Sequence, residues 1–228
     1  MSSKKFINEE VVSNYGYPVG FRVKDISKQV AMLREFFPGI GFADEKLAER
    51  PLPPNAEGWF AIPRLTRVAT SYAEAVKEVL ELIKQQRKFG NLCEGIFCPK
   101  YQRQTAKTAK MFQKLGDEQK GHDILVVPAQ FGLRHRDRST WRAQEVFTAN
   151  EFGLGPFEVG CMLLTHPKRF AASNNLGIDC AGDECAPDTD GNFSEVPCFF
   201  FEGRFWFNAH RFDHAYSGFG SASGFLPE

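Results

Sequence analysis

The stretch Cys198-Phe-Phe-Phe-Glu-Gly-Arg-Phe-Trp-Phe207 decides the fold class. Two aromatic runs flank Glu202-Gly203, and a two-residue turn that contains glycine between such runs predicts a β-hairpin. The chain becomes β-like after residue 155, whereas the clearest helical patterns lie earlier. Because helices and strands are segregated, we expect an α+β fold rather than an alternating parallel sheet. Helices should lie mainly in the N-terminal half, with antiparallel strands and the hairpin in the C-terminal half.

The strongest helical pattern covers 71–89. Ser71 and Glu74 form a capping-box pair, apolar residues recur on one face, and Gly90 follows the end. Other helices are expected at 25–37, at about 100–115 and at 139–149. Strands are expected at 58–62 and 124–127, and each of them is followed by a proline. The apolar run 157–164 fits either a strand or a short helix.

Composition indicates one packed globular domain over residues 1–228, with 1–20 as an extended N-terminal arm. The chain is 43% hydrophobic and 25% charged, which is the balance of a folded protein. No apolar segment follows the lysines near the N-terminus, and no run is long enough to cross a bilayer. Six cysteines without a secretion signal indicate a reducing compartment. We therefore expect a cytoplasmic protein without a membrane partner.

Charge is unevenly distributed, although the whole chain is neutral. Residues 100–143 carry net charge +6, and residues 144–228 carry −8. A basic stripe is expected on the third helix, followed by an arginine-rich loop. These features favour contact with an RNA or DNA backbone; an exposed, solubilising helix face is the alternative. The predicted binding residues are Arg103, Lys107, Lys110, Lys114, Arg134, Arg136, Arg138 and Arg142.

Two cysteines and two histidines have spacings that could serve a zinc ion. Cys180 and Cys185 enclose four residues, and His210 and His214 enclose three. The hairpin between the pairs could bring the four side chains into a tetrahedral site. A variant of this hypothesis uses Cys93 and Cys98 in place of the histidines. The alternative is that the cysteines are small buried residues without metal.

An enzyme is the competing class of function. The acidic and Cys/His residues of 179–214 could form a hydrolase-like site if Asp179, Asp183, Glu184 and His210 meet in one pocket. Cys161 with His166, and His122 with Asp123, are weaker pairs for nucleophilic or acid–base chemistry. The chain has no phosphate-binding loop, dinucleotide fingerprint or nucleophile elbow. A third alternative is a non-catalytic subunit that binds a protein partner through exposed aromatic residues.

Overall fold

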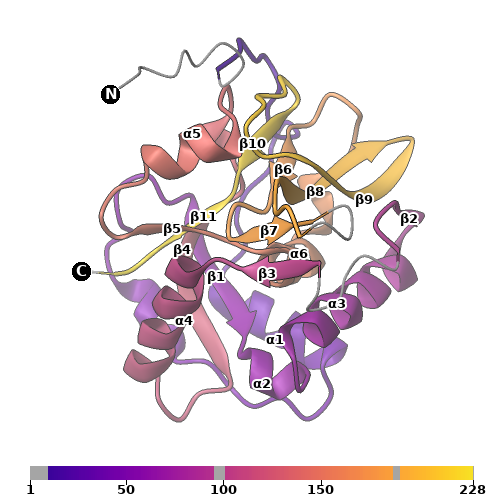
Figure 1. Cartoon of the computed structure of the whole chain (residues 1–228). Coiled ribbons are helices and arrows are strands. Elements are labelled where there is room, and N and C mark those ends of the chain that lie inside the picture. Colours follow the sequence, from indigo (N-terminus) through magenta and orange to yellow (C-terminus); the bar gives the residue numbers. More distant parts are fainter. Residues whose placement is uncertain (1–9, 95–100, 187–190, 228) are drawn as a thin grey trace.

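Two β-sheets enclose the core together with a buried helix (Figure 1). The computed structural model describes residues 10–94, 101–186 and 191–227. Within these residues the fold is α+β, with helices mostly in the N-terminal half and antiparallel or mixed strands mostly in the C-terminal half. The predicted fold class is therefore confirmed.

The first sheet has four antiparallel strands in the order β1-β4-β11-β5. Their bounds are Gly58–Pro63 (β1), Ile124–Gln130 (β4), Ser223–Phe225 (β11) and Glu151–Gly153 (β5). Every residue of β4 is buried, as expected for an apolar strand inside a sheet. Strand β11 comes from the end of the sequence and lies between strands that occur much earlier.

The second sheet contains the predicted hairpin. Its strand order is β10-β6-β8-β7-β3, and β9 joins it by pairing with β8 and β2. The bounds are Phe89–Asn91 (β2), Gln102–Gln104 (β3), Gly177–Asp179 (β6), Asp183–Cys185 (β7), Glu195–Glu202 (β8), Arg204–Arg211 (β9) and Phe219–Ser221 (β10). Glu202 pairs with Arg204, so only Gly203 stands at the turn. Its φ of +67° explains the glycine.

Six α-helices pack around the sheets in the described part of the chain. They are α1 (Ile26–Phe36), α2 (Leu65–Val68), α3 (Tyr72–Gln86), α4 (Ala106–Glu118), α5 (Thr140–Glu145) and α6 (Pro156–Thr165). Three short 3-10 helices are η1 (Glu45–Glu49), η2 (Leu133–His135) and η3 (Pro167–Arg169). None of the described helices is long and apolar enough to span a membrane.

Helix α6 resolves the ambiguity of the apolar run 157–164. All of its residues are buried, and it packs against α1, α3 and β1. A helix that is covered on every side has no polar face, so its periodicity could not identify it. The predicted capping box of α3 is confirmed, with Ser71 accepting a hydrogen bond from the Glu74 backbone. The third predicted helix begins later than expected, at Ala106, with Thr105 as its N-cap.

Candidate functional site

Helix α4 presents the predicted lysines away from the core. We call Lys107, Lys110 and Lys114 the lysine face. All three are exposed, whereas Thr108 and Leu115 on the other side of the helix are buried. In the described residues, no carboxylate lies within ion-pair distance of a lysine of this face. An external anion would therefore meet no competing carboxylate on the lysine face, although Lys107 Nζ lies over the Phe147 ring, 5.5 Å from its centre.

Arg103 does not belong to this face. It lies in strand β3, which precedes the helix, and its guanidinium Nη2 is 2.7 Å from Glu184 Oε2. The same guanidinium stacks 4.0 Å from the centre of the Phe193 ring. The helix starts at Ala106 because Thr105 caps it, and this start separates Arg103 from the stripe.

The arginines of the predicted basic loop already have contacts within the chain. Arg142 forms ion pairs with Glu10 and Glu145, and Arg136 donates to the Tyr15 carbonyl. Arg138 donates to the carbonyl of Arg134. These bonds attach the loop to its own scaffold and to the N-terminal segment. The loop arginines therefore have less freedom to bind a ligand than the lysine face has.

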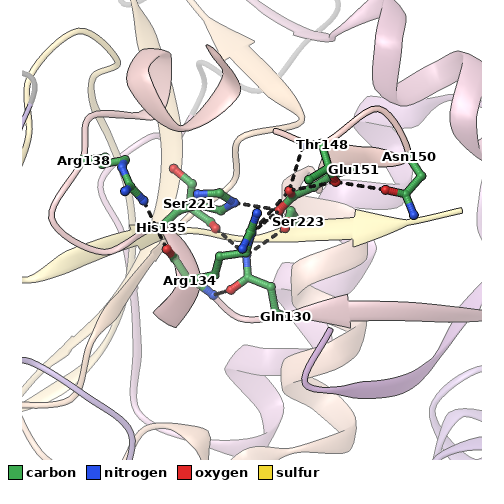
Figure 2. Close-up of polar contacts among 10 residues, drawn as sticks. Gln130, Arg134, His135, Arg138, Thr148, Asn150, Glu151, Ser221 and Ser223 are labelled. Carbon is green, nitrogen blue, oxygen red and sulfur yellow. Dashed lines mark hydrogen bonds and ion pairs between the residues drawn. The ribbon is translucent and has the colours of Figure 1, made fainter. Parts of the chain in front are cut away.

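Arg134 contacts a buried carboxylate, that of Glu151 on strand β5 (Figure 2). Arg134 Nε lies 3.3 Å from Glu151 Oε1, His135 Nε2 lies 2.7 Å from the same oxygen, and Ser223 Oγ donates to it at 2.7 Å. Glu151 and His135 are 0% and 1% exposed. The side chains that meet at Glu151 come from η2, β5 and β11, so this carboxylate ties distant segments together.

The bonding at Glu151 fixes its charge. Burial on its own would raise the pKa of Glu151. The hydrogen bonds from His135 and Ser223 outweigh burial and lower the pKa to about 2. Burial lowers the pKa of His135. At neutral pH the ring is therefore neutral and donates its Nε2–H to an ionised Glu151. His135 Nδ1 is buried and has no hydrogen-bond partner in the described residues.

The structure does not gather the residues of the zinc prediction. Cys180 and Cys185 are buried free cysteines, His210 Nε2 lies 2.9 Å from Asp179 Oδ1, and His214 packs against the Tyr216 ring. Within the described ranges, no group of three or more His, Cys, Asp or Glu side chains could hold a metal ion. Cys98, the other half of the variant pair, lies outside the described residues. Zinc binding thus gains no support.

The acidic residues of the enzyme hypothesis go to separate places. Asp179 meets His210, Asp183 bonds to Tyr72, and Glu184 pairs with Arg103 on the outside. Cys198 Sγ also lies 3.9 Å from His210 Nδ1, but burial raises the pKa of the Cys198 thiol well above its usual value. A buried, protonated thiol is a poor nucleophile.

The two weaker pairs are engaged elsewhere. The ring of His166 accepts a hydrogen bond from the Lys24 backbone and bonds to the Met162 carbonyl, and burial lowers the pKa of this ring to about 4. Burial raises the pKa of the Cys161 thiol. Asp123 accepts from the Gly41 backbone and pairs with Arg67. His166 and Asp123 therefore serve the fold, and His122 Nδ1 is buried without a hydrogen-bond partner in the described residues.

A second buried carboxylate, Glu158 of α6, was missed in the sequence. Tyr72 links it to Asp183, since the phenol oxygen lies 2.8 Å from Asp183 Oδ1 and 3.3 Å from Glu158 Oε2. Gln102 donates to Asp183 Oδ2 at 2.6 Å, and Gln104 donates to Glu158 Oε1 at 3.2 Å. We call these five side chains the carboxyl cluster.

The charge of the carboxyl cluster differs from that of Glu151. Burial raises the pKa of Glu158 to about 7. Burial and the nearby Glu158 also raise the pKa of Asp183 well above its usual value. One sequence signal points to the site: Glu158 is a lone acid within the apolar run after Gly155-Pro156, at the third position of a helix. Its bond to the Gly155 backbone is a capping contact.

Comparison of the chain with protein-family models, with curated proteins and with solved structures finds no match.

Proposed function

We propose that this protein binds a polyanion, most plainly the phosphate backbone of RNA or DNA, through the lysine face of α4. The observation that carries the proposal is the lysine face itself: three exposed ammonium groups on one side of a helix, with no carboxylate partner among the described residues. A surface of this kind attracts phosphates without reading base sequence.

The geometry of the helix suits a backbone contact. A helix rises about 1.5 Å per residue, so Lys107 and Lys114 stand about 10 Å apart along its axis. One strand of a duplex carries a phosphate every 3.4 Å or so along the helix axis, so this length spans about three phosphates. Phe112 packs edge-on against Phe152 on the opposite side of α4 and holds the lysines outward.

The arginines Arg103, Arg134 and Arg142 are not part of this surface, because carboxylates of the same chain already hold them. Arg103 and Arg142 are ion-paired to carboxylates, and a phosphate would have to displace these partners. Three lysines alone predict weak binding with a modest salt dependence. For single strands, the slope of log affinity against log salt should be about −2.

The test is a fluorescence anisotropy titration with a labelled single-stranded RNA and a labelled DNA duplex at low salt. We expect micromolar binding that is lost when Lys107, Lys110 and Lys114 are changed together to Glu. The matched control changes Lys28, Lys46 and Lys84 to Glu, which alters the net charge equally on other elements. Absence of binding, or an equal loss in both triple variants, would overturn the proposal.

A further inference from the structure

The carboxyl cluster lacks a positive charge. No Lys, Arg or His side chain of the described residues lies within ion-pair distance of Glu158 or Asp183. Both side chains are nonetheless buried, at 3% and 1% exposure. Buried acids are normally paired with a cation or kept neutral. Here only amides, a phenol and a backbone N–H meet the carboxyls.

One acceptor of the cluster is also unsatisfied. Gln102 is 5% exposed and uses its Nε2 on Asp183, while its Oε1 has no hydrogen-bond partner in the described residues. A buried amide oxygen without a donor costs about 1–3 kcal/mol. The cluster is therefore rich in acceptors and poor in donors as well as in positive charge.

A cavity adjoins this cluster. Its volume is about 190 Å³, and Glu158 and Gln104 contribute to its wall. The other lining is mainly apolar, from Ile62, Leu65, Phe112, Leu125 and Phe157. This volume is below the range of pockets that hold drug-sized ligands, so the occupant must be small.

Arg64 is the cationic residue of this lining, and its side chain is bonded to backbone carbonyls. Its Nε donates to the His122 carbonyl, and its Nη2 donates to the carbonyls of Gly116 and Gln119 near the end of α4. The guanidinium thus serves backbone acceptors and forms no ion pair with Glu158.

We propose that this cavity binds a small primary ammonium ion, whose N–H groups meet Glu158 and Gln104 and whose short alkyl chain lies against Leu125 and Phe157. An ammonium group brings three donors and one positive charge, which is what the cluster lacks. The apolar wall accommodates the hydrocarbon part. This inference does not depend on polyanion binding, since the lysine face lies on the opposite side of α4 from Phe112.

Binding should be coupled to proton release. Burial holds the pKa of Glu158 at about 7, so the carboxyl is largely protonated in mildly acidic solution. An ammonium ion favours the carboxylate, and the proton must therefore leave when the ligand enters. Affinity should rise with pH through about 7 and then level off.

The experiment is calorimetric titration of the full chain with alkylammonium chlorides from methyl to pentyl, in two buffers of different ionisation enthalpy. We expect saturable binding with proton release below pH 7, and no binding of the matching neutral alcohols. Glu158→Gln should weaken binding at least tenfold, or about 1.4 kcal/mol. Glu118→Gln on the exposed face of α4 is the control and should leave binding unchanged.

A second variant tests the cavity independently in case Glu158→Gln does not fold. Leu65 is a partly exposed residue of the cavity wall, so Leu65→Trp should fill the cavity while every residue of the carboxyl cluster stays unchanged. It should abolish binding while circular dichroism remains that of the wild type. Three results would overturn the proposal: no saturable binding by any amine of the series, equal binding of the alcohols, or unchanged affinity in a folded Glu158→Gln or Leu65→Trp variant.

Discussion

Glu151 and Glu158 are close in the sequence and both are buried, yet in mildly acidic solution Glu151 is ionised and Glu158 is largely protonated. Glu151 meets His135, Arg134 and Ser223, and its pKa lies at about 2. Glu158 meets a phenol, an amide and a backbone N–H, and its pKa lies at about 7. Burial alone would raise the pKa of both glutamates. The comparison teaches that the partners of a buried acid decide its charge.

The two acids therefore give stability opposite pH dependences. The contribution of Glu151 is present above the pKa of an unfolded glutamate and is lost as pH falls from about 4.5 toward 2. Glu158 has a raised pKa, so the folded state loses stability as pH rises from about 4.5 to 7. We expect the most stable folded state in mildly acidic solution.

The largest effect is expected from Glu151→Gln. This change removes the negative partner of Arg134 and His135 in a buried site and should cost about 3–5 kcal/mol at neutral pH. Urea unfolding followed by tryptophan fluorescence measures it. Glu145→Gln, which removes only an exposed partner of Arg142, should change stability by less than about 1 kcal/mol. Similar losses in the two variants would contradict the distinct role of Glu151.

Glu158→Gln should increase the free energy of unfolding above neutral pH, whereas Glu151→Gln decreases it. The variant keeps a neutral side chain at all pH values, so it avoids the cost of ionising a buried acid. We expect it to exceed the wild type by about 3 kcal/mol at alkaline pH and to match it near pH 4.5. Unfolding curves across this range provide the measurement, with Glu78→Gln on the exposed side of α3 as control. Parallel curves for wild type and variant would refute the prediction.

Ser223→Ala tests one bond of the first centre. Ser223 Oγ donates to Glu151, and a hydrogen bond to a charged group contributes about 1.5–3 kcal/mol. Stability should fall by about 2 kcal/mol, and the acid unfolding midpoint should move to higher pH because the pKa of Glu151 rises. Ser217→Ala, an exposed serine nearby in the sequence, is the control. An unmoved acid midpoint would show that Ser223 does not help to keep Glu151 ionised.

Tyr72→Phe should have the smallest effect. It removes a phenol that donates to Asp183 and contacts Glu158, at a cost of about 1 kcal/mol. Because the Tyr72 hydrogen bond lowers the pKa of Glu158, this pKa should rise further. Carbon-13 NMR titration of the glutamate carboxyls measures the shift. A fall in the pKa would mean that the phenol favours the neutral acid instead.

Local patterns predicted the fold class well. The capping box at Ser71 and the aromatic runs around Gly203 depend on neighbours in the chain, and both formed as expected. The predicted start of α4, at about residue 100, is too early, because Arg103 has helical spacing to Lys107 but lies in β3. Pairing of β3 with β7 makes that residue part of a strand, and this pairing joins segments far apart in sequence.

The buried acids show why the rest could not be predicted. Gln104 is paired with Asp183 through strands β3 and β7, and α6 adds Glu158 from another segment. No local pattern encodes such a meeting. The lysine face was found because helical spacing sets it, whereas the partners that occupy Arg134 and Arg142 come from other parts of the chain. Residue spacing predicts which side chains share one face of a helix. Tertiary contacts decide which charged side chains on that face have an ion-pair partner.

Strand β11 makes assembly of the first sheet depend on a late part of the chain. Ser223 pairs with Gln130 on one side and with Gly153 on the other, so residues 223–225 lie in the middle of that sheet. A nascent chain that has emerged only to residue 200 has both neighbouring strands but not the strand that joins them. Contacts across such sequence distances slow folding. During synthesis, the edges of β4 and β5 that pair with β11 therefore stay unpaired until residues 223–225 are made. Glu151 lacks the hydrogen bond from Ser223 for the same time.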